Sequence, residues 1–314
     1  MNTEEEYIIR LSPLHNVVFT CIFQNEQKAG PAMLDFLNAV LKHVGEEPIV
    51  EIISMRSEYS LIGERHDDKY SRLDVRVRAE SGRLFDIEVQ IEKDYMNERG
   101  FVYGGRMMLD ATKSGMNYDE LPEVRVITLA DFYIREDRSH LVEPVVLAYK
   151  NHPSELATEK FKIYHIQLPA FRKHYKTLDS VKNDDFLSWL YLLDRGYQDE
   201  KEMEALSMRT EGMRNFAAQY HMAMNDPDLV RRYRMIEDGL RDVATRISVA
   251  EKKAEARGEA RGEARGEARG EARGIAIGEA AGMRATVKKF KQQGVDYALI
   301  TAATGLTPEE IDQL

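Results

Sequence analysis

The feature that most constrains the fold is an alternating stretch at residues 72–92, which reads as two β-strands joined by a tight turn. Apolar residues stand at the odd positions of residues 73–77 and again at the odd positions of residues 85–91. Opposite residues of a hairpin share a face, so the apolar positions of the two arms must pair with each other. A three-residue loop at residues 80–82, with Gly82 at positive φ, gives that register.

This register predicts which residues face each other across the hairpin. Val75 is expected opposite Ile87, and Asp74 opposite Glu88, with Gln90 beside them. Two carboxylates placed directly opposite each other are destabilising. The pairing makes sense if a divalent cation binds between them, so Asp74 and Glu88 are candidate metal ligands.

The same residues support a resemblance to a known family. Asp74, a short hairpin and then Glu88-Val89-Gln90 resemble the metal-binding core of the PD-(D/E)XK nuclease superfamily, with Gln90 in the place of the usual Lys. The surrounding motifs are similar to the Rpn family of recombination-promoting nucleases, also labelled transposases. These motifs are Phe36–Leu41, Asp67-Asp68-Lys69 before Asp74, and Arg99, Tyr103 and Arg106 after the hairpin. The resemblance covers residues 12–250, and the tail more loosely.

The resemblance implies an α/β fold: a PD-(D/E)XK restriction-endonuclease-like core with a mixed sheet flanked by helices, followed by a helical C-terminal region. The alternation of helical and strand-like segments up to residue 130 independently favours an α/β domain. The implied activity is divalent-metal-dependent cleavage of DNA, with Mg²⁺, or alternatively Mn²⁺ or Ca²⁺, as the cofactor. This would make the chain a DNA endonuclease of the recombination-promoting or transposase-like type.

The resemblance also implies roles for individual residues. Asp74, Glu88 and the carbonyl of Val89 would hold the metal, and Gln90 would orient the attacking water. An amide can hold a water but cannot take its proton, whereas a bound metal can itself lower the pKa of that water. Lys69 completes the expected catalytic set of Asp74, Glu88, Gln90 and Lys69.

Arg99, Tyr103 and Arg106 are the expected substrate-binding residues. Their spacings of four and three place them on one face of a helix expected between Asp94 and Asp110. Two arginines on one face can clamp a phosphate or a carboxylate of the site. The alternative is that this face is simply solvated.

The sequence departs from the family pattern at two positions. Asn16 and Thr20 stand where the family usually carries an Asp and a Lys. This departure supports an alternative function, in which a catalytically weakened family member acts as a DNA-recruited or partner-binding assembly protein.

Composition limits the other possibilities. The net charge of −10 argues against indiscriminate binding of nucleic acid, so any contact with DNA must depend on a local basic patch. Cys21 is the only cysteine, which rules out an internal disulfide. No apolar run reaches the ~20 residues that span a bilayer, and the acidic N-terminus has no signal-peptide profile. We therefore expect a cytoplasmic protein without membrane contact.

The chain divides by composition into four expected parts. These are a nuclease-like domain at residues 1–178, a helical region at 179–253, a Gly-Glu-Ala-Arg low-complexity repeat at 254–274 and a small helical module at 275–314. Within them, Pro31 is expected in the first turn of a helix, residues 124–130 as a central strand, and Trp189 as a core anchor.

The repeat offers no favourable charge pair at i,i+4, and each Gly costs about 1 kcal/mol relative to Ala in a helix. It is expected either to form a solvated, fraying helix or to align its Glu stripe with the Arg stripe of a second chain. The final helix carries Glu309, Glu310 and Asp312, which would repel phosphates. The C-terminal helices are thus expected to serve packing or homo-oligomerisation rather than DNA reading.

Overall fold

The structure is a computed structural model that describes residues 10–23, 26–57, 75–91, 96–135 and 140–314. It contains two compact units, Met1–Ile236 and Glu237–Leu314, which are described separately. No helix among the described residues has an apolar stretch long enough to cross a membrane.

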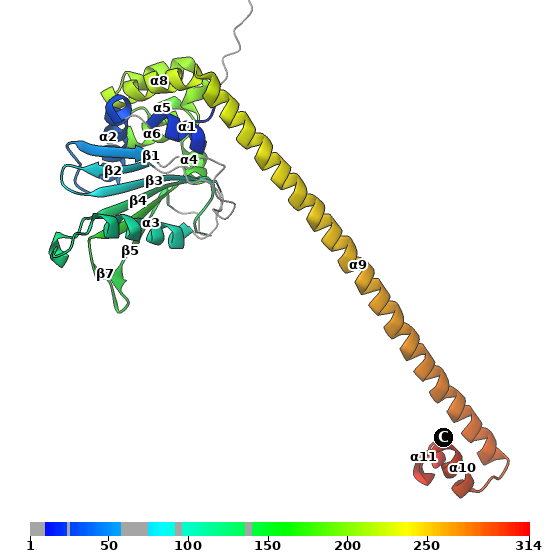
Figure 1. Cartoon of the computed structure of the whole chain (residues 1–314). Coiled ribbons are helices and arrows are strands. Elements are labelled where there is room, and N and C mark those ends of the chain that lie inside the picture. Colours follow the sequence, from blue (N-terminus) through cyan, green and yellow to red (C-terminus); the bar gives the residue numbers. More distant parts are fainter. Residues whose placement is uncertain (1–9, 24–25, 58–74, 92–95, 136–139) are drawn as a thin grey trace, which may run out of the picture. The chain divides into compact units, whose positions relative to one another are not determined.

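The first unit is built on a mixed sheet (Figure 1). Its described part has six strands in the order β1 (Ile52–Ser57), β2 (Val75–Ala79), β3 (Leu84–Gln90), β4 (Val124–Ala130), β8 (Phe161–Gln167) and β5 (Val142–Val146). Strands β3, β4 and β8 are parallel to one another, and the other pairs are antiparallel. A separate two-stranded sheet joins β6 (Ala148–Tyr149) and β7 (His152–Leu156).

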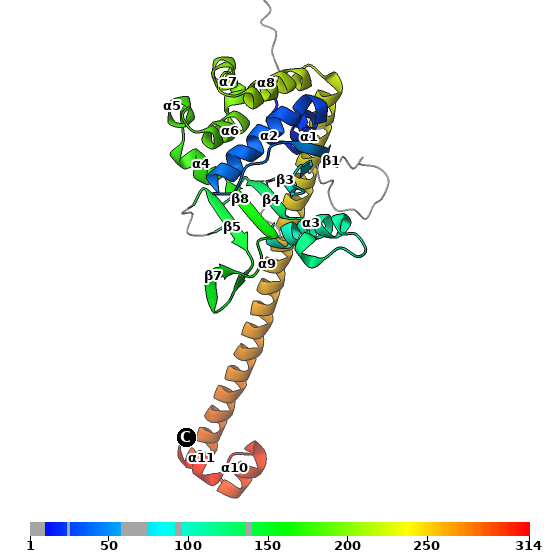
Figure 2. The ribbon, with the colours of Figure 1, turned by 90° about the vertical axis from the view of Figure 1, so that its left-hand side faces the viewer.

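Helices cover both faces of the sheet (Figures 1 and 2). One face carries α3 (Met96–Ala111), which connects the parallel strands β3 and β4. The other carries a larger helical layer: α1 (Asn16–Phe23), α2 (Glu26–His43), α4 (Leu168–His174), α5 (Leu178–Val181), α6 (Asp185–Asp194), α7 (Glu200–Ser207) and α8 (Glu211–Met224), with the short turns η1 (Tyr118–Glu120) and η2 (Gly196–Gln198) in the connections. A mixed sheet flanked by helices confirms the predicted fold class.

The position of Pro31 differs from the expectation. Helix α2 begins at Glu26, so Pro31 lies inside the helix and not in its first turn. A proline there costs a main-chain hydrogen bond. The following turns bury a continuous apolar stripe that includes Met33, Phe36 and Leu37, each at most 1% exposed. Tertiary packing of this kind outweighs local propensity and extends the helix through the proline.

The hairpin has the register that the sequence predicts. Val75 lies opposite Ile87, and Gly82 takes a φ of 84° in the turn. Asp74 lies outside the described residues. The polar side of the hairpin is shielded from solvent on β3, because every residue from Leu84 to Gln90 is buried. Strands β2 and β4 flank β3, and helices cover both of its faces.

The two faces of the sheet have different cores. The odd-numbered residues of β3, such as Phe85 and Ile87, join the large core, which also contains Trp189 and Phe216 from the later helices. Trp189 is fully buried, as predicted, and its Nε1 donates to Asp35 Oδ2 at 2.8 Å. A smaller core lies under α3. There Gly104 is required, because a Cβ at this position would overlap the ring of Phe161.

The second unit begins within α9 (Pro227–Gln292), which is helical through the whole Gly-Glu-Ala-Arg repeat. Every residue of the repeat is exposed. The unit ends in α10 (Tyr297–Thr304) and α11 (Pro308–Asp312), which pack on the end of α9 around Val287, Ile300 and Ile311. Thr307 caps α11, because its side chain accepts a hydrogen bond from Glu310 N–H.

Candidate functional site

The candidate site lies on the face of the sheet that α3 covers. Cross-strand pairing places Glu88 of β3 beside Thr128 of β4, Thr128 beside His165 of β8, and His165 beside Glu143 of β5. Residues paired in this way share a face. Glu88, Thr128 and His165 are each at most 3% exposed. A buried row of polar side chains therefore crosses the three strands β3, β4 and β8, ends at the half-buried Glu143 of β5, and has Glu88 as its buried carboxylate.

Two side chains hold the Glu88 carboxylate. Arg99 Nη2 and Gln90 Nε2 both donate hydrogen bonds to Glu88 Oε1. Gln90 is two residues along β3 on the same face, and Arg99 is in the first turns of α3. A buried carboxylate needs partners of this kind to remain charged. The helix after the hairpin thus completes the environment of this strand residue.

The main chain of β3 offers a further oxygen. Gln90 O accepts from Asp131 N–H at 2.8 Å on the β4 side, and Arg83 O accepts from Ala79 N–H at 2.9 Å on the β2 side. Successive carbonyls along a strand point to opposite sides. The carbonyl of Val89 therefore points toward the β2 side, away from β4. This is the direction in which the sequence predicts Asp74.

The three substrate-binding candidates on α3 are placed differently. Arg99 contacts Glu88, and its guanidinium carbon lies 5.8 Å from the centre of the Tyr103 ring, a cation–π distance. Tyr103 is 4% exposed, so it supports Arg99 from within the fold. Arg106 is exposed and makes no hydrogen bond or ion pair with a described residue. The structure brings Arg99 to the site carboxylate and leaves Arg106 at the surface.

Other predicted site residues lie where the structure gives no description. Asp74 and Lys69 are outside the described residues. Within the described part of the chain, no group of three or more His, Cys, Asp or Glu side chains is arranged to hold a metal ion. The described oxygens of the expected site are the Glu88 carboxylate and the Val89 carbonyl.

His165 and Asp86 are polar residues that the sequence did not single out. His165 is fully buried, and its Nε2 lies 3.1 Å from Asn97 Oδ1 at the start of α3. Burial lowers the pKa of His165 to about 4, so the ring is neutral near pH 7. Asp86 is fully buried on β3, directly opposite Arg76 of β2. The alternation in β3 already indicates that Asp86 shares a face with Glu88. His165 reaches this face only because two strands that are distant in the sequence pair with each other.

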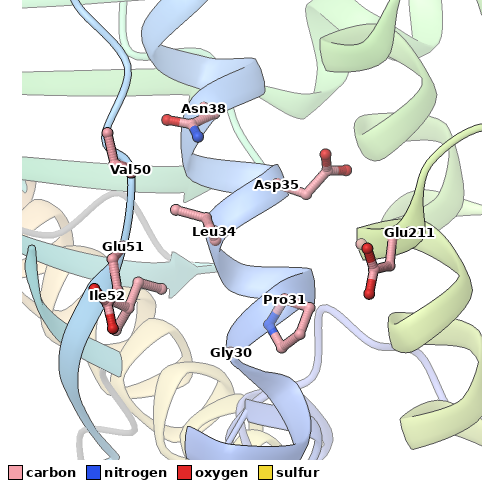
Figure 3. Close-up of a pocket in the computed structure, with 10 residues that line it drawn as sticks. Gly30, Pro31, Leu34, Asp35, Asn38, Val50, Glu51, Ile52 and Glu211 are labelled. Atoms are coloured by element: carbon pink, nitrogen blue, oxygen red, sulfur yellow. The ribbon is translucent and has the colours of Figure 1, made fainter.

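A separate cavity of about 480 Å³ lies between α2, the start of β1 and α8 (Figure 3). Asp35, Glu51 and Glu211 contribute carboxylates to its lining. Asp35 Oδ2 accepts hydrogen bonds from Trp189 Nε1 at 2.8 Å and from Thr210 Oγ1 at 2.7 Å. Asp35 thus joins helices of the core, and none of the predicted site residues lines this cavity.

Comparison with known proteins agrees with the geometry. A family model described as PD-(D/E)XK nuclease family transposase matches residues 13–250. Comparisons with curated proteins and with solved structures gave no match. The match covers the sheet, α3 and the helices of the first unit, including Glu88-Val89-Gln90. This chain belongs to the PD-(D/E)XK nuclease family transposases.

Proposed function

We propose that the protein is a divalent-metal-dependent DNA endonuclease that hydrolyses phosphodiester bonds. Membership of a nuclease family gives the general class. The observation that carries the specific proposal is the buried Glu88 carboxylate on β3, held by Arg99, next to a Val89 carbonyl that points toward β2. Asp74 immediately precedes β2, and the pairing at Val75 and Ile87 has the register that predicts Asp74 opposite Glu88.

The donor atoms fit a hard divalent cation. Asp74 and Glu88 would supply carboxylate oxygens and Val89 a carbonyl oxygen, the ligand types that Mg²⁺, Mn²⁺ and Ca²⁺ prefer. Neither a thiolate nor an imidazole belongs to this set. When bound, such an ion lowers the pKa of a coordinated water and neutralises charge on a phosphate. Mg²⁺ is the proposed cofactor, with Mn²⁺ and Ca²⁺ as the alternatives to be compared.

Arg99 has two tasks in this proposal. Its bond to Glu88 keeps the buried carboxylate ionised and oriented without a metal. Its side chain is 27% exposed, so the fold covers it only in part, and we propose that it also contacts a phosphate oxygen of the substrate. An arginine fork can bind a carboxylate and a phosphate at once, because it carries five N–H donors.

Gln90 and Lys69 take the remaining roles. The Gln90 amide donates to Glu88, and its carbonyl can accept a hydrogen bond from a water molecule and so orient it. Gln90 cannot take the proton of that water, so the proton passes to solvent or to a phosphate oxygen. Lys69 is proposed to contact the phosphate, and Tyr103 to support Arg99 through its ring.

The test is nicking of supercoiled plasmid DNA by the full chain, with Mg²⁺ and with EDTA. The wild-type protein should nick only with the metal, and Glu88→Gln should not nick. Arg214→Gln is the matched control, because Arg214 is exposed on α8 and forms no ion pair with a described residue. Nicking that persists in EDTA, or that survives Glu88→Gln in a folded variant, contradicts the proposal.

Asn16 and Thr20 favour a second candidate function, binding of DNA or a partner without cleavage. Thr20 is 2% exposed on α1 and its hydroxyl forms no hydrogen bond with a described residue. A threonine cannot supply the positive charge of the Lys that the family resemblance implies at this position. Under this alternative, the wild-type protein retains DNA in a binding assay and fails to nick it with Mg²⁺, Mn²⁺ or Ca²⁺.

A further inference from the structure

Three arginines lie together on the part of the sheet next to α3. Arg56 of β1 is directly opposite Arg76 of β2, and Arg78 follows Arg76 on the same face. Residues two apart on a strand are about 7 Å apart, and directly opposite Cα atoms are about 5 Å apart. Three guanidinium groups therefore extend from one small area of sheet. We call Arg56, Arg76 and Arg78 the arginine face.

The arginine face is open to solvent. Arg56 and Arg78 are exposed, and Arg76 is half-buried. Arg76 lies opposite the buried Asp86, which supplies a nearby negative charge. Neither Arg56 nor Arg78 forms a hydrogen bond or an ion pair with another described residue. The apolar side chains of β2, such as Val77, point to the opposite face and are buried, whereas Ile53 at the bulge of β1 is exposed.

The arginine face concentrates positive charge in one area of the sheet. Like charges directly opposite each other on a sheet repel, as Arg56 and Arg76 do here, and Asp86 opposite Arg76 offsets part of that repulsion. The concentration of positive charge also contrasts with the net charge of −10 of the whole chain. An anionic partner would turn this repulsion into attraction, as a metal would for two facing carboxylates.

The arginine face continues into the candidate site. Arg76 pairs with Asp86, two residues before Glu88 on the same strand and the same face. Arg99 of α3 contacts Glu88, and Arg106 is exposed seven residues further along the same side of that helix. The arginine face, Glu88 and its partner Arg99 thus belong to the same face of the sheet.

We propose that the arginine face binds the phosphate backbone of DNA and leads it to Glu88. The choice of DNA as the anion rests on the proposed function. The chemistry of the face supports it: its three charged groups are arginines, which bind phosphates with two donors, and the residue paired with Arg78 is the polar Ser54. Contacts of this kind position a nucleic acid and carry no sequence information.

The test measures binding in EDTA, so that it does not depend on cleavage. The full chain is titrated against a fluorescent 20-base-pair duplex at several salt concentrations, and anisotropy gives the affinity. Each neutralised phosphate contributes about 0.9 to the slope of log K against log salt. Arg56→Gln combined with Arg78→Gln should reduce that slope by about 1.8 and weaken binding at least tenfold at 0.1 M salt. Arg56→Lys combined with Arg78→Lys should retain the slope, because each lysine still neutralises one phosphate.

The control pair is Arg214→Gln combined with Lys201→Gln, which removes two exposed positive charges from α7 and α8. It should bind the duplex as the wild type does, and thermal unfolding should show that all variants are folded. An unchanged slope in the Arg56 and Arg78 Gln variant, an equal loss in the control pair, or loss of the slope in the lysine variant overturns the inference. Binding of polyglutamate in preference to the duplex also overturns it. Retained binding without nicking would contradict the endonuclease and leave this inference standing.

Discussion

Arg99 Nη2 donates a hydrogen bond to Glu88 Oε1, joining the first turns of α3 to the strand that carries the Glu-Val-Gln motif. The Glu88 side chain is 4% exposed and that of Arg99 is 27% exposed. The pair is therefore asymmetric. Removing the arginine leaves a buried carboxylate without its cationic partner, whereas removing the carboxylate leaves a cation that can reach solvent.

Arg99→Ala should accordingly destabilise the protein. A buried ion pair that loses one partner costs about 3–5 kcal/mol, and the partial exposure of Arg99 reduces this to about 1–3 kcal/mol. Arg106→Ala is the control on the same helix face and should change stability by less than about 0.5 kcal/mol, because Arg106 is exposed. Urea unfolding of the two variants measures the difference. Equal stability would show that the Arg99 contact contributes little.

Arg106 is expected to matter for catalysis instead. If it contacts the phosphate of the substrate, Arg106→Lys should lower the nicking rate several-fold, because a bidentate fork becomes a point charge. Plasmid nicking under Mg²⁺ measures the rate, with Arg214→Lys as the control. A wild-type rate in a folded Arg106→Lys protein would support a solvated face at this position.

Asp74→Asn should alter stability in a way that depends on the metal. Two facing carboxylates repel each other, so neutralising Asp74 should stabilise the metal-free protein slightly and remove nicking. In the wild type, Mg²⁺ at 100 times its dissociation constant should add about 2.7 kcal/mol to the free energy of unfolding. Calorimetry in EDTA and in Mg²⁺ compares the two proteins. A wild type without a metal-induced shift, together with a less stable Asp74→Asn variant, would exclude the metal site.

Deletion of Gly258–Arg273 removes four Gly-Glu-Ala-Arg units from α9 and should leave the fold of the first unit intact. All the deleted residues are exposed and bury no apolar surface. The thermal midpoint of the first unit should therefore change by no more than about 2 °C, since burial is what stabilises a helix of this composition. Calorimetry of the deleted and full chains tests this. A fall of many degrees would show that the repeat packs against something.

Local patterns predicted much of the first unit. The alternation around Gly82 gave the hairpin register, and the apolar run at Val124–Ala130 gave a central strand with the observed bounds. These succeeded because side-chain period and turn chemistry are local properties of the chain. Pro31 was wrongly placed at the first turn of its helix, since packing of the later turns decides where α2 begins.

Local sequence patterns did not predict which strands, distant in the sequence, pair with each other in the sheet. His165 reaches the site face because β8 pairs in parallel with β4, placing His165 beside Thr128, which in turn lies beside Glu88. No spacing in the sequence indicates that register, because parallel strands joined by long connections are set by the packing of the whole domain. The burial of β3 on both faces has the same origin, because α3 covers one face and the larger helical layer covers the other.

His165 gives a prediction for the dependence of stability on pH. Its pKa in the folded protein is lowered by burial to about 4, against about 6.5 in an unfolded chain. Between these values the unfolded state binds more protons, so His165 makes the free energy of unfolding fall as the pH drops from 6.5 to 4. The loss should amount to a few kcal/mol and be complete below pH 4.

His165→Gln should remove this component of the pH dependence. The glutamine Nε2 takes the place of the histidine Nε2, can still donate to Asn97 Oδ1 and does not titrate, so the variant tests the charge with a polar group retained. At pH 7 the variant should be less stable than the wild type, because the larger histidine ring fills the space at this position. As the pH falls toward 4, the difference in the free energy of unfolding between the two proteins should shrink. Urea unfolding of both proteins at pH 7, 6, 5 and 4.5 measures this difference. Parallel curves for the two proteins would show that His165 is not the group that protonates on unfolding.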